Sequence, residues 1–144
     1  MGDPRYQAHI PDRDRMHDMP NVAMYMTQEE GTAVTPPPGH VLLVGAIAMN
    51  EGFGFDDHAK YEEDIAEISG RHGMKLVRSF RVLNTIGAGP TNVAAVNVWS
   101  LPSPDALGQV MGDPEYVGNI PNRDRIHDMA STSMYFVAPR GQNQ

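Results

Sequence analysis

MGDPEYVGNIPNRDRIHDM, residues 111–129, lies near the end of this 144-residue chain, and MGDPRYQAHIPDRDRMHDM, residues 1–19, opens it. Aligned without gaps over residues 1–28 and 111–138, the two segments agree at 15 positions. Chance does not produce such agreement, so the chain contains a partial internal repeat. The structure of the repeated segment, and the surface it packs against, decide the fold.

The repeated segment is predicted to form a helical region followed by a strand. Ser103 is a good N-cap and Pro104 suits the first helical position, so the helical region begins just before the repeat. Pro114 and Pro121 can each begin a fresh helical segment, but either would interrupt a continuous helix. The apolar run STSMYFVA, residues 131–138, then predicts a strand.

Three more strands and one helix are predicted upstream of this region. VLLVGAIAMN, residues 41–50, is typical of a buried strand, and residues 74–84 and 93–101 alternate well enough for two others. Residues 56–72 have the apolar spacing of a helix. The order β-α-β-β-α-β over residues 41–138 predicts an α+β, ferredoxin-like unit, with an antiparallel sheet and both helices on one face.

The chain is therefore predicted to contain the second half of a ferredoxin-like unit, a linker and one whole unit. We predict a helix–strand arm at residues 1–28, a Pro-rich linker at 29–39, a ferredoxin-like domain at 40–139 and a tail at 140–144. The arm is either the remnant of a truncated tandem duplication or a functional element. In both cases it needs another sheet, in cis or in trans. We expect a homo-oligomer, formed by strand exchange of residues 22–27.

Composition limits the possible partners and location. The formal net charge of −7 argues against a nucleic-acid-binding surface. The chain has no cysteine, which excludes disulfides and thiolate chemistry. Its longest apolar run, residues 41–49, is about half the length that a bilayer span needs. We expect a cytoplasmic protein that binds a small molecule and neither nucleic acid nor a membrane.

Residues 96–125, VNVWSLPSPDALGQVMGDPEYVGNIPNRDR, carry a family resemblance. Over residues 41–138 the chain resembles the small uncharacterised domains of the dimeric α/β-barrel superfamily. In those domains a Ser-Pro-Asp/Glu-Ala helix start and an Asp-Pro-Glu-Tyr step precede an arginine-bearing helix. The resemblance implies two ferredoxin-like sheets paired into a barrel, and the superfamily also has tandem members that form the barrel from one chain.

The resemblance does not choose a reaction, because relatives on this fold differ in chemistry. They include cofactor-independent monooxygenases, muconolactone isomerase, polyketide cyclases, stress-responsive barrel proteins and haem-dependent peroxidases. Haem binding is a weaker option for this chain, because no histidine stands out as an axial ligand.

The His127-Asp128 step is the first candidate for chemistry, and the arm repeats it as His17-Asp18. A positioned histidine acts as a general acid or base near neutral pH. The alternative is a polar helix end, where a histidine interacts with the helix dipole. Arg125, in the RDR step just before it, is a candidate for binding a carboxylate or enolate, with surface ion pairing as the alternative.

Histidines also lie at both ends of the apolar face of the first predicted helix. His58, Tyr61 and His72 share that face, and either histidine can enter a pocket beside Tyr61, with a core position as the alternative. The two histidines are 14 residues apart, roughly 21 Å along a helix, and cannot share a metal ion. No close histidine pair has ligand spacing, so we predict no metal.

Two predicted strands supply the remaining candidates. Arg78 alternates with apolar residues, and on an inward face its guanidinium requires an anionic partner or ligand; the opposite register stays open. Asn97 and Trp99 share one strand face and can line the same cavity. Tyr116 is either a half-buried anchor or a further site residue.

We therefore predict a cofactor-independent enzyme, a lyase, isomerase, cyclase or oxygenase, that acts on an apolar carbonyl-bearing compound between sheet and helices. The alternative is a non-catalytic ligand-binding or assembly module. The candidate catalytic residues are His127, His72, Arg78 and Arg125, and the candidate substrate-binding residues are Tyr61, Asn97, Trp99, Tyr116 and His58.

Overall fold

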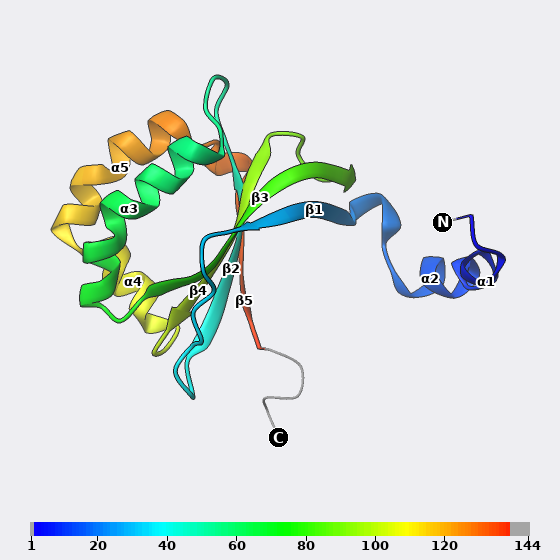
Figure 1. Cartoon of the computed structure of the whole chain (residues 1–144), viewed down its shortest axis with the longest axis horizontal. Helices are drawn as coiled ribbons and strands as arrows, with labels where there is room; N and C mark the ends of the chain where they lie inside the picture. Colours follow the sequence, from blue (N-terminus) through cyan, green and yellow to red (C-terminus); the bar gives the residue numbers. More distant parts are fainter. Residues whose placement is uncertain (1, 139–144) are drawn as a thin grey trace.

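The computed structural model describes residues 2–138 and has an α+β fold, which confirms the predicted class (Figure 1). The arm contains α1 (Pro4–Ala8), α2 (Ile10–Met16), a 3-10 turn (Met19–Asn21) and β1 (Ala23–Glu30). The remaining elements are β2 (Val41–Ala48), α3 (Phe55–Arg71), β3 (Lys75–Gly87), β4 (Val93–Leu101), α4 (Asp105–Gly112), α5 (Pro114–Ile126), a second 3-10 turn (Met129–Ser131) and β5 (Ser133–Val137). The predicted tail, residues 140–144, lies outside the described residues.

The strands form one antiparallel sheet in the order β1-β3-β4-β2-β5. Figure 1 shows α3, α4 and α5 layered on one side of this sheet, while the arm extends away from the opposite end of the molecule. Among residues 2–138 no helix packs on the other side of the sheet, and we call that side the uncovered face. Within residues 2–138, no helix has both the length and the apolar character needed to cross a bilayer.

The core lies between the helices and the sheet. Leu43 of β2, Trp99 of β4 and Ile65 of α3 are all buried there, as the period-two and helical spacings require. On the uncovered face the alternating residues are only half-buried, as Val44 of β2 and Val96 of β4 show. This difference leaves an apolar sheet surface without a covering layer.

The two copies of the repeat differ in how their helices run. Pro114 begins α5, as expected, but Pro121 lies inside a continuous helix, so the prediction of a fresh segment there is wrong. In the arm the corresponding helix is divided at His9 into α1 and α2. Helix α5 packs against α3 and α4, and this packing stabilises a helix that proline would otherwise break.

Strand β1 pairs in cis with the edge of β3 and is longer than predicted. It continues to Glu30, into the stretch that the sequence assigns to the linker. The added residues are held by ion pairs, Glu29 with Arg78 at 2.8 Å and Glu30 with Arg81 at 2.7 Å. The linker boundary at residue 29 is therefore corrected to residue 31.

A glycine in β2 makes room for a side chain of β4. Gly45 faces Asn97 across the strand pair, and a Cβ at Gly45 would lie 2.5 Å from Asn97 Oδ1. We expect Gly45→Ala to lower the free energy of unfolding by about 1–3 kcal/mol through overpacking, measured by urea denaturation.

Gly118→Ala is the matched control, because a Cβ at Gly118 meets nothing within 4 Å and the arm carries Ala8 at the corresponding position. That exposed helical change should stabilise the chain by up to about 1 kcal/mol. Equal effects of the two substitutions would contradict the close approach at Gly45.

Candidate functional site

A cavity of about 130 Å³ lies between the helical layer and the sheet, and we call it the helix-side cavity. An apolar cavity of roughly 150 Å³ binds benzene, so the space suits a ligand the size of one ring. Its apolar wall includes Ile47, Ile65, Met74, Trp99, Leu107, Val110, Met111, Met129 and Met134. Its polar residues are His58, Tyr61, Ser69, Asn97, Tyr116, Arg123, His127 and Thr132.

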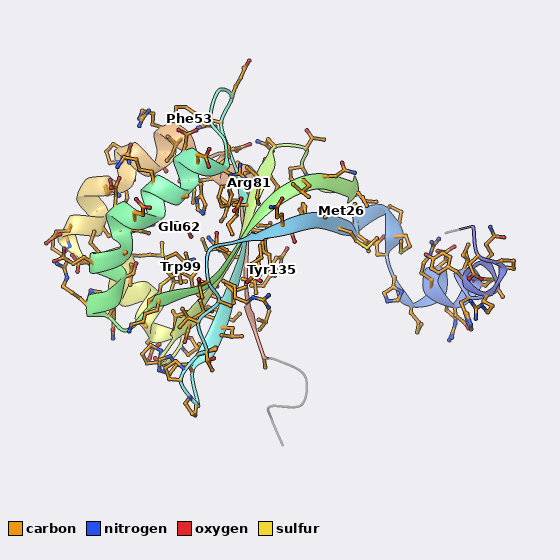
Figure 2. The ribbon with its side chains drawn as sticks, in the orientation of Figure 1. Met26, Phe53, Glu62, Arg81, Trp99 and Tyr135 are labelled. Atoms are coloured by element: carbon orange, nitrogen blue, oxygen red, sulfur yellow. The ribbon has the colours of Figure 1, made fainter. Side chains whose placement is uncertain are left out.

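Two histidines and a glutamate form a buried polar network at this cavity. His127 lies at the end of α5, and its Nδ1 is 2.8 Å from the carbonyl oxygen of Arg123. Its Nε2 is 2.9 Å from Nδ1 of His58. His58 Nε2 lies 3.3 Å from Oε2 of Glu62, one turn further along α3. Figure 2 labels Glu62 on α3 and Trp99, both between the helices and the sheet.

The hydrogen-bond directions in this network follow from its one fixed acceptor. The Arg123 carbonyl only accepts, so His127 Nδ1 carries a proton and its Nε2, in the neutral ring, is an acceptor. His58 Nδ1 must then donate to that nitrogen. His58 Nε2 and Glu62 Oε2 both face Asn97 Nδ2, at 3.4 and 3.1 Å, and one further proton between them makes their own contact a hydrogen bond. The His127–His58–Glu62 network therefore has a place for one transferable proton next to the cavity.

Burial keeps His127 neutral. It lowers the pKa of His127 to about 4, and the hydrogen bond to the Arg123 carbonyl offsets only part of this effect. The His127 ring also meets the Tyr61 ring edge-on, with centroids 4.8 Å apart. At neutral pH, His127 Nε2 therefore keeps its lone pair.

Asn97 anchors the network from β4 and leaves one atom free. Its Nδ2 donates to Glu62 Oε2 at 3.1 Å. Its Oδ1 is buried, and among the described residues nothing donates to it; the same is true of the Ser69 hydroxyl oxygen. Buried polar atoms rarely stay unpaired in proteins, and both side chains line the cavity. These atoms are suitable partners for polar groups of a ligand.

Two tyrosines and an arginine form a second polar group in the cavity wall. Arg123 Nη1 donates to the Tyr116 hydroxyl at 3.0 Å, which leaves the hydroxyl proton of Tyr116 free to donate. Burial raises the pKa of Tyr61, and the neighbouring Tyr116 raises it further, so Tyr61 stays protonated. The cavity thus has hydrogen-bond donors as well as the proton-holding network.

Six of the nine residues predicted for the site line this one cavity. They come from three elements, α3, β4 and α5, and from the residue that follows α5, which the fold brings together. The six are His58, Tyr61, Asn97, Trp99, Tyr116 and His127.

The structure places His72 outside the helix-side cavity. Its Nε2 bonds Asp113 at 2.9 Å at the end of α3, where Arg71 also contacts that carboxylate. The hydrogen bond from His72 is the main reason that the pKa of Asp113 is lowered. Asp113 is also the N-cap of α5, so His72 joins two helix ends. The interpretation of His72 as a catalytic residue lining the cavity is corrected.

The two arginines predicted to act in catalysis also lie elsewhere. Arg78 is half-exposed, pairs with Glu29, and lies over the Phe80 ring instead of pointing into the cavity. Arg125 is exposed at the surface, where it lies over Phe53 and donates to Asn122. Arg125 therefore lies at the surface, but its partners there are an amide and an aromatic ring instead of the carboxylate that the stated alternative of ion pairing requires.

Sequence reasoning missed Glu62 as a site residue, and of the two arginines in the RDR step it chose Arg125 instead of Arg123. Glu62 follows His58 by four residues, which puts both side chains on one helix face, and this spacing was an available signal. Arg123 follows Tyr116 by seven residues, two helical turns, and the arm repeats the pair as Tyr6 and Arg13.

Within residues 2–138, no three His, Cys, Asp or Glu side chains are grouped so as to hold a metal ion. In comparisons with known proteins, no family model matches the chain and no curated protein matches its sequence.

Proposed function

We propose that the protein is a cofactor-independent enzyme that moves a proton on a small, largely apolar carbonyl compound bound in the helix-side cavity. Isomerases, lyases, cyclases and some oxygenases share this step. The observation that carries the proposal is the buried His127–His58–Glu62 network, which has a place for one transferable proton beside a cavity whose wall is largely apolar. Buried titratable groups at a cavity are typical of active sites.

The chemistry begins with loss of a proton from the carbon next to the carbonyl group. His127 Nε2, the ring nitrogen that keeps its lone pair, accepts this proton in place of the hydrogen bond from His58 Nδ1, and the Glu62 carboxylate balances the positive charge that develops on the histidine pair. Negative charge then develops on the substrate oxygen. The Tyr116 hydroxyl, polarised by Arg123, donates to that oxygen and stabilises the enolate. Return of the proton to another carbon gives an isomer.

The remaining cavity residues bind and orient the substrate. Trp99 and the methionine side chains contact its apolar body. Asn97 Oδ1 accepts a hydrogen bond from a hydroxyl or N–H group of the substrate. A ligand that offers both a donor and a carbonyl oxygen therefore satisfies both polar parts of the wall.

Hydrogen–deuterium exchange tests this proposal without knowledge of the natural substrate. Ring-sized ketones are incubated with the protein in D₂O, and loss of the proton signal next to the carbonyl is followed by NMR. We expect the protein to accelerate exchange for at least one ketone. His58→Gln and Glu62→Gln should each reduce the acceleration at least tenfold, because each removes a member of the proton network.

His17→Gln is the matched control, because His17 has the same local hydrogen bond as His127, from Nδ1 to the Arg13 carbonyl, but is exposed. The His17→Gln protein should accelerate exchange of the ketone as much as the wild type does. A folded His58→Gln chain that retains wild-type exchange would overturn the proposal.

A ligand-binding module without catalysis is the second candidate function. Four methionines line the cavity, Met74, Met111, Met129 and Met134, and such flexible side chains adapt to varied ligands. A compound that raises the melting temperature, in a chain that accelerates no exchange on any ketone, would favour this alternative.

We also propose that two copies associate through the uncovered face, as the resemblance to dimeric α/β barrels implies. Apolar side chains on this face are only half-buried, among them Val44, Val96, Val98 and Phe80. A contiguous apolar sheet surface of this kind is typical of an interface. In such a barrel the ferredoxin-like sheets face each other and the helices stay outside, so the helix-side cavity of each copy remains intact.

A further inference from the structure

The two copies of the repeated strand lie at the two edges of the sheet. β1 pairs with β3 and β5 pairs with β2, both antiparallel. Since β3 and β2 are both antiparallel to β4, β1 and β5 run in the same direction. Within residues 2–138, each has one paired edge and one free edge in the order β1-β3-β4-β2-β5.

Equivalent residues of the two strands also face the same side of the sheet. Met134 of β5 lines the helix-side cavity. Its equivalent, Met24, lies on the same side of β1 as Gln28. Gln28 pairs with Arg81 of β3, which pairs in turn with Ala95 of β4, and Ala95 is buried under the helices. Met24 therefore faces the helix side of the sheet. With direction and facing both equal, β1 and β5 must use opposite edges for pairing. The unpaired edge of β5 therefore corresponds to the edge of β1 that binds β3.

We infer that the free edge of β5 fits β3 of a second copy of this chain, and that β1 is an internal substitute which occupies that site on β3. When β1 leaves, β5 of each copy pairs with β3 of the other. The two four-stranded sheets then close into a ring with their uncovered faces inside. This inference rests on the proposed association through the uncovered face, and it is independent of the catalytic proposal.

The arm has contacts that favour the closed, single-chain state. Arg78 binds Glu29 through two hydrogen bonds of 2.8 Å, and Arg81 binds Glu30 at 2.7 Å. Strand β5 ends at Val137, which corresponds to Thr27, so its described part has no residue that corresponds to Glu29 or Glu30. Strand β1 therefore competes well against a partner's β5.

The first test loosens the arm in the full-length chain. Glu29→Arg with Glu30→Arg places arginine opposite Arg78 and Arg81, and each lost ion pair contributes about 0.2–1 kcal/mol. We expect the dissociation constant of the dimer, measured by analytical ultracentrifugation, to fall about tenfold. Glu67→Gln, an exposed change on α3 away from the arm, is the control and should leave it unchanged.

The second test fixes the arm on β3. The chain has no native cysteine, and Met24 lies directly opposite Ile86. A disulfide in Met24→Cys/Ile86→Cys should hold the chain as a monomer, and reduction should restore association. Because the bond is made within one chain, denaturing electrophoresis should show no covalent dimer.

The third test reports the strand pairing itself. If β5 takes the place of β1, Met134 of one copy lies opposite Ile86 of the other, so Met134→Cys/Ile86→Cys should form a disulfide between copies. β2 and β4 separate β5 from β3 in one chain, which prevents the bond from forming internally. Each single-cysteine variant controls for random oxidation.

The outcomes distinguish the inference from the association on which it rests. Dimers that form no bond between positions 134 and 86 would overturn the strand pairing but leave association through the uncovered face. A dimer weakened by the charge reversal would favour strand exchange of residues 22–27 and overturn the role of β1 as a competitor. Monomers under every condition would overturn both proposals.

Discussion

Trp99→Ala should lower the free energy of unfolding by about 3–5 kcal/mol, a large fraction of the stability of a domain this size. Trp99 is 5% exposed and packs where the helix-side cavity meets the core. Its loss removes buried apolar area and leaves a hole that the surrounding side chains fill only in part. Urea denaturation followed by circular dichroism measures the change, since the substitution removes the only tryptophan.

Indole provides the matched rescue, because it has the ring system that the substitution removes. A saturating concentration should recover about 1–3 kcal/mol in Trp99→Ala by mass action, and much less in the wild type. Trp99→Phe, which keeps an aromatic ring, should lose less stability than Trp99→Ala. A loss below about 1 kcal/mol in Trp99→Ala would contradict the packing described for β4.

The free energy of unfolding should fall by about 3 kcal/mol as pH is lowered from about 6.5 to about 4, because of the titration of His127 alone. The pKa of His127 is about 4 in the folded chain, against 6.5 for a free histidine. Between these values the unfolded chain binds the extra proton, so acid favours unfolding; above pH 6.5 the contribution is fully present. The groups facing this ring are His58, Glu62 and Tyr61 on α3 and Arg123 on α5.

Urea denaturation at several pH values measures how steeply the free energy of unfolding changes with pH. His127→Gln should be less stable than wild type at pH 7 and should lose most of the pH dependence between 6.5 and about 4. Ile65→Val, a core change without a titratable group, should lower stability by about 1 kcal/mol at every pH and leave the slope unchanged. An unchanged slope in His127→Gln would show that His127 is not the group responsible.

The sequence was sufficient to predict the element order because hydrophobic spacing is a local signal. β4 (Val93–Leu101) has the predicted bounds, and α3 differs from its prediction by one residue at each end. The same spacing placed His58 and Tyr61 on one helix face and Asn97 and Trp99 on one strand face. Those two faces meet across the core, which explains why all four line the cavity.

The failed prediction for Arg78 has a local cause. The strand pairing shifts between Leu76 and Arg78, so β3 contains a bulge there. Leu76 is paired with the buried Trp99, whereas Arg78, after the bulge, lies on the opposite side of the sheet. Strict alternation puts both side chains on one face, and no composition signal in the strand shows the shift.

Glu62 was missed for a different reason. A carboxylate in a charged helix is normally solvated, and sequence alone does not show that this position will face β4. The residue is 5% exposed, with His58 of its own helix and Asn97 of β4 as its partners. Tertiary packing, and not local spacing, converts it from a surface charge into a member of the proton network.

The repeated strand, paired on one edge in β1 and on the other in β5, has a consequence for the behaviour of the chain at high concentration. A strand able to pair on both edges cannot carry the usual protections against aggregation, such as proline or an inward-facing lysine. Residues 133–137 contain neither, and Tyr135 and Phe136 are about half exposed, at 59% and 47%. Such an edge invites intermolecular β-pairing. Solubility should therefore depend on what covers β5, and Tyr135→Lys should raise it.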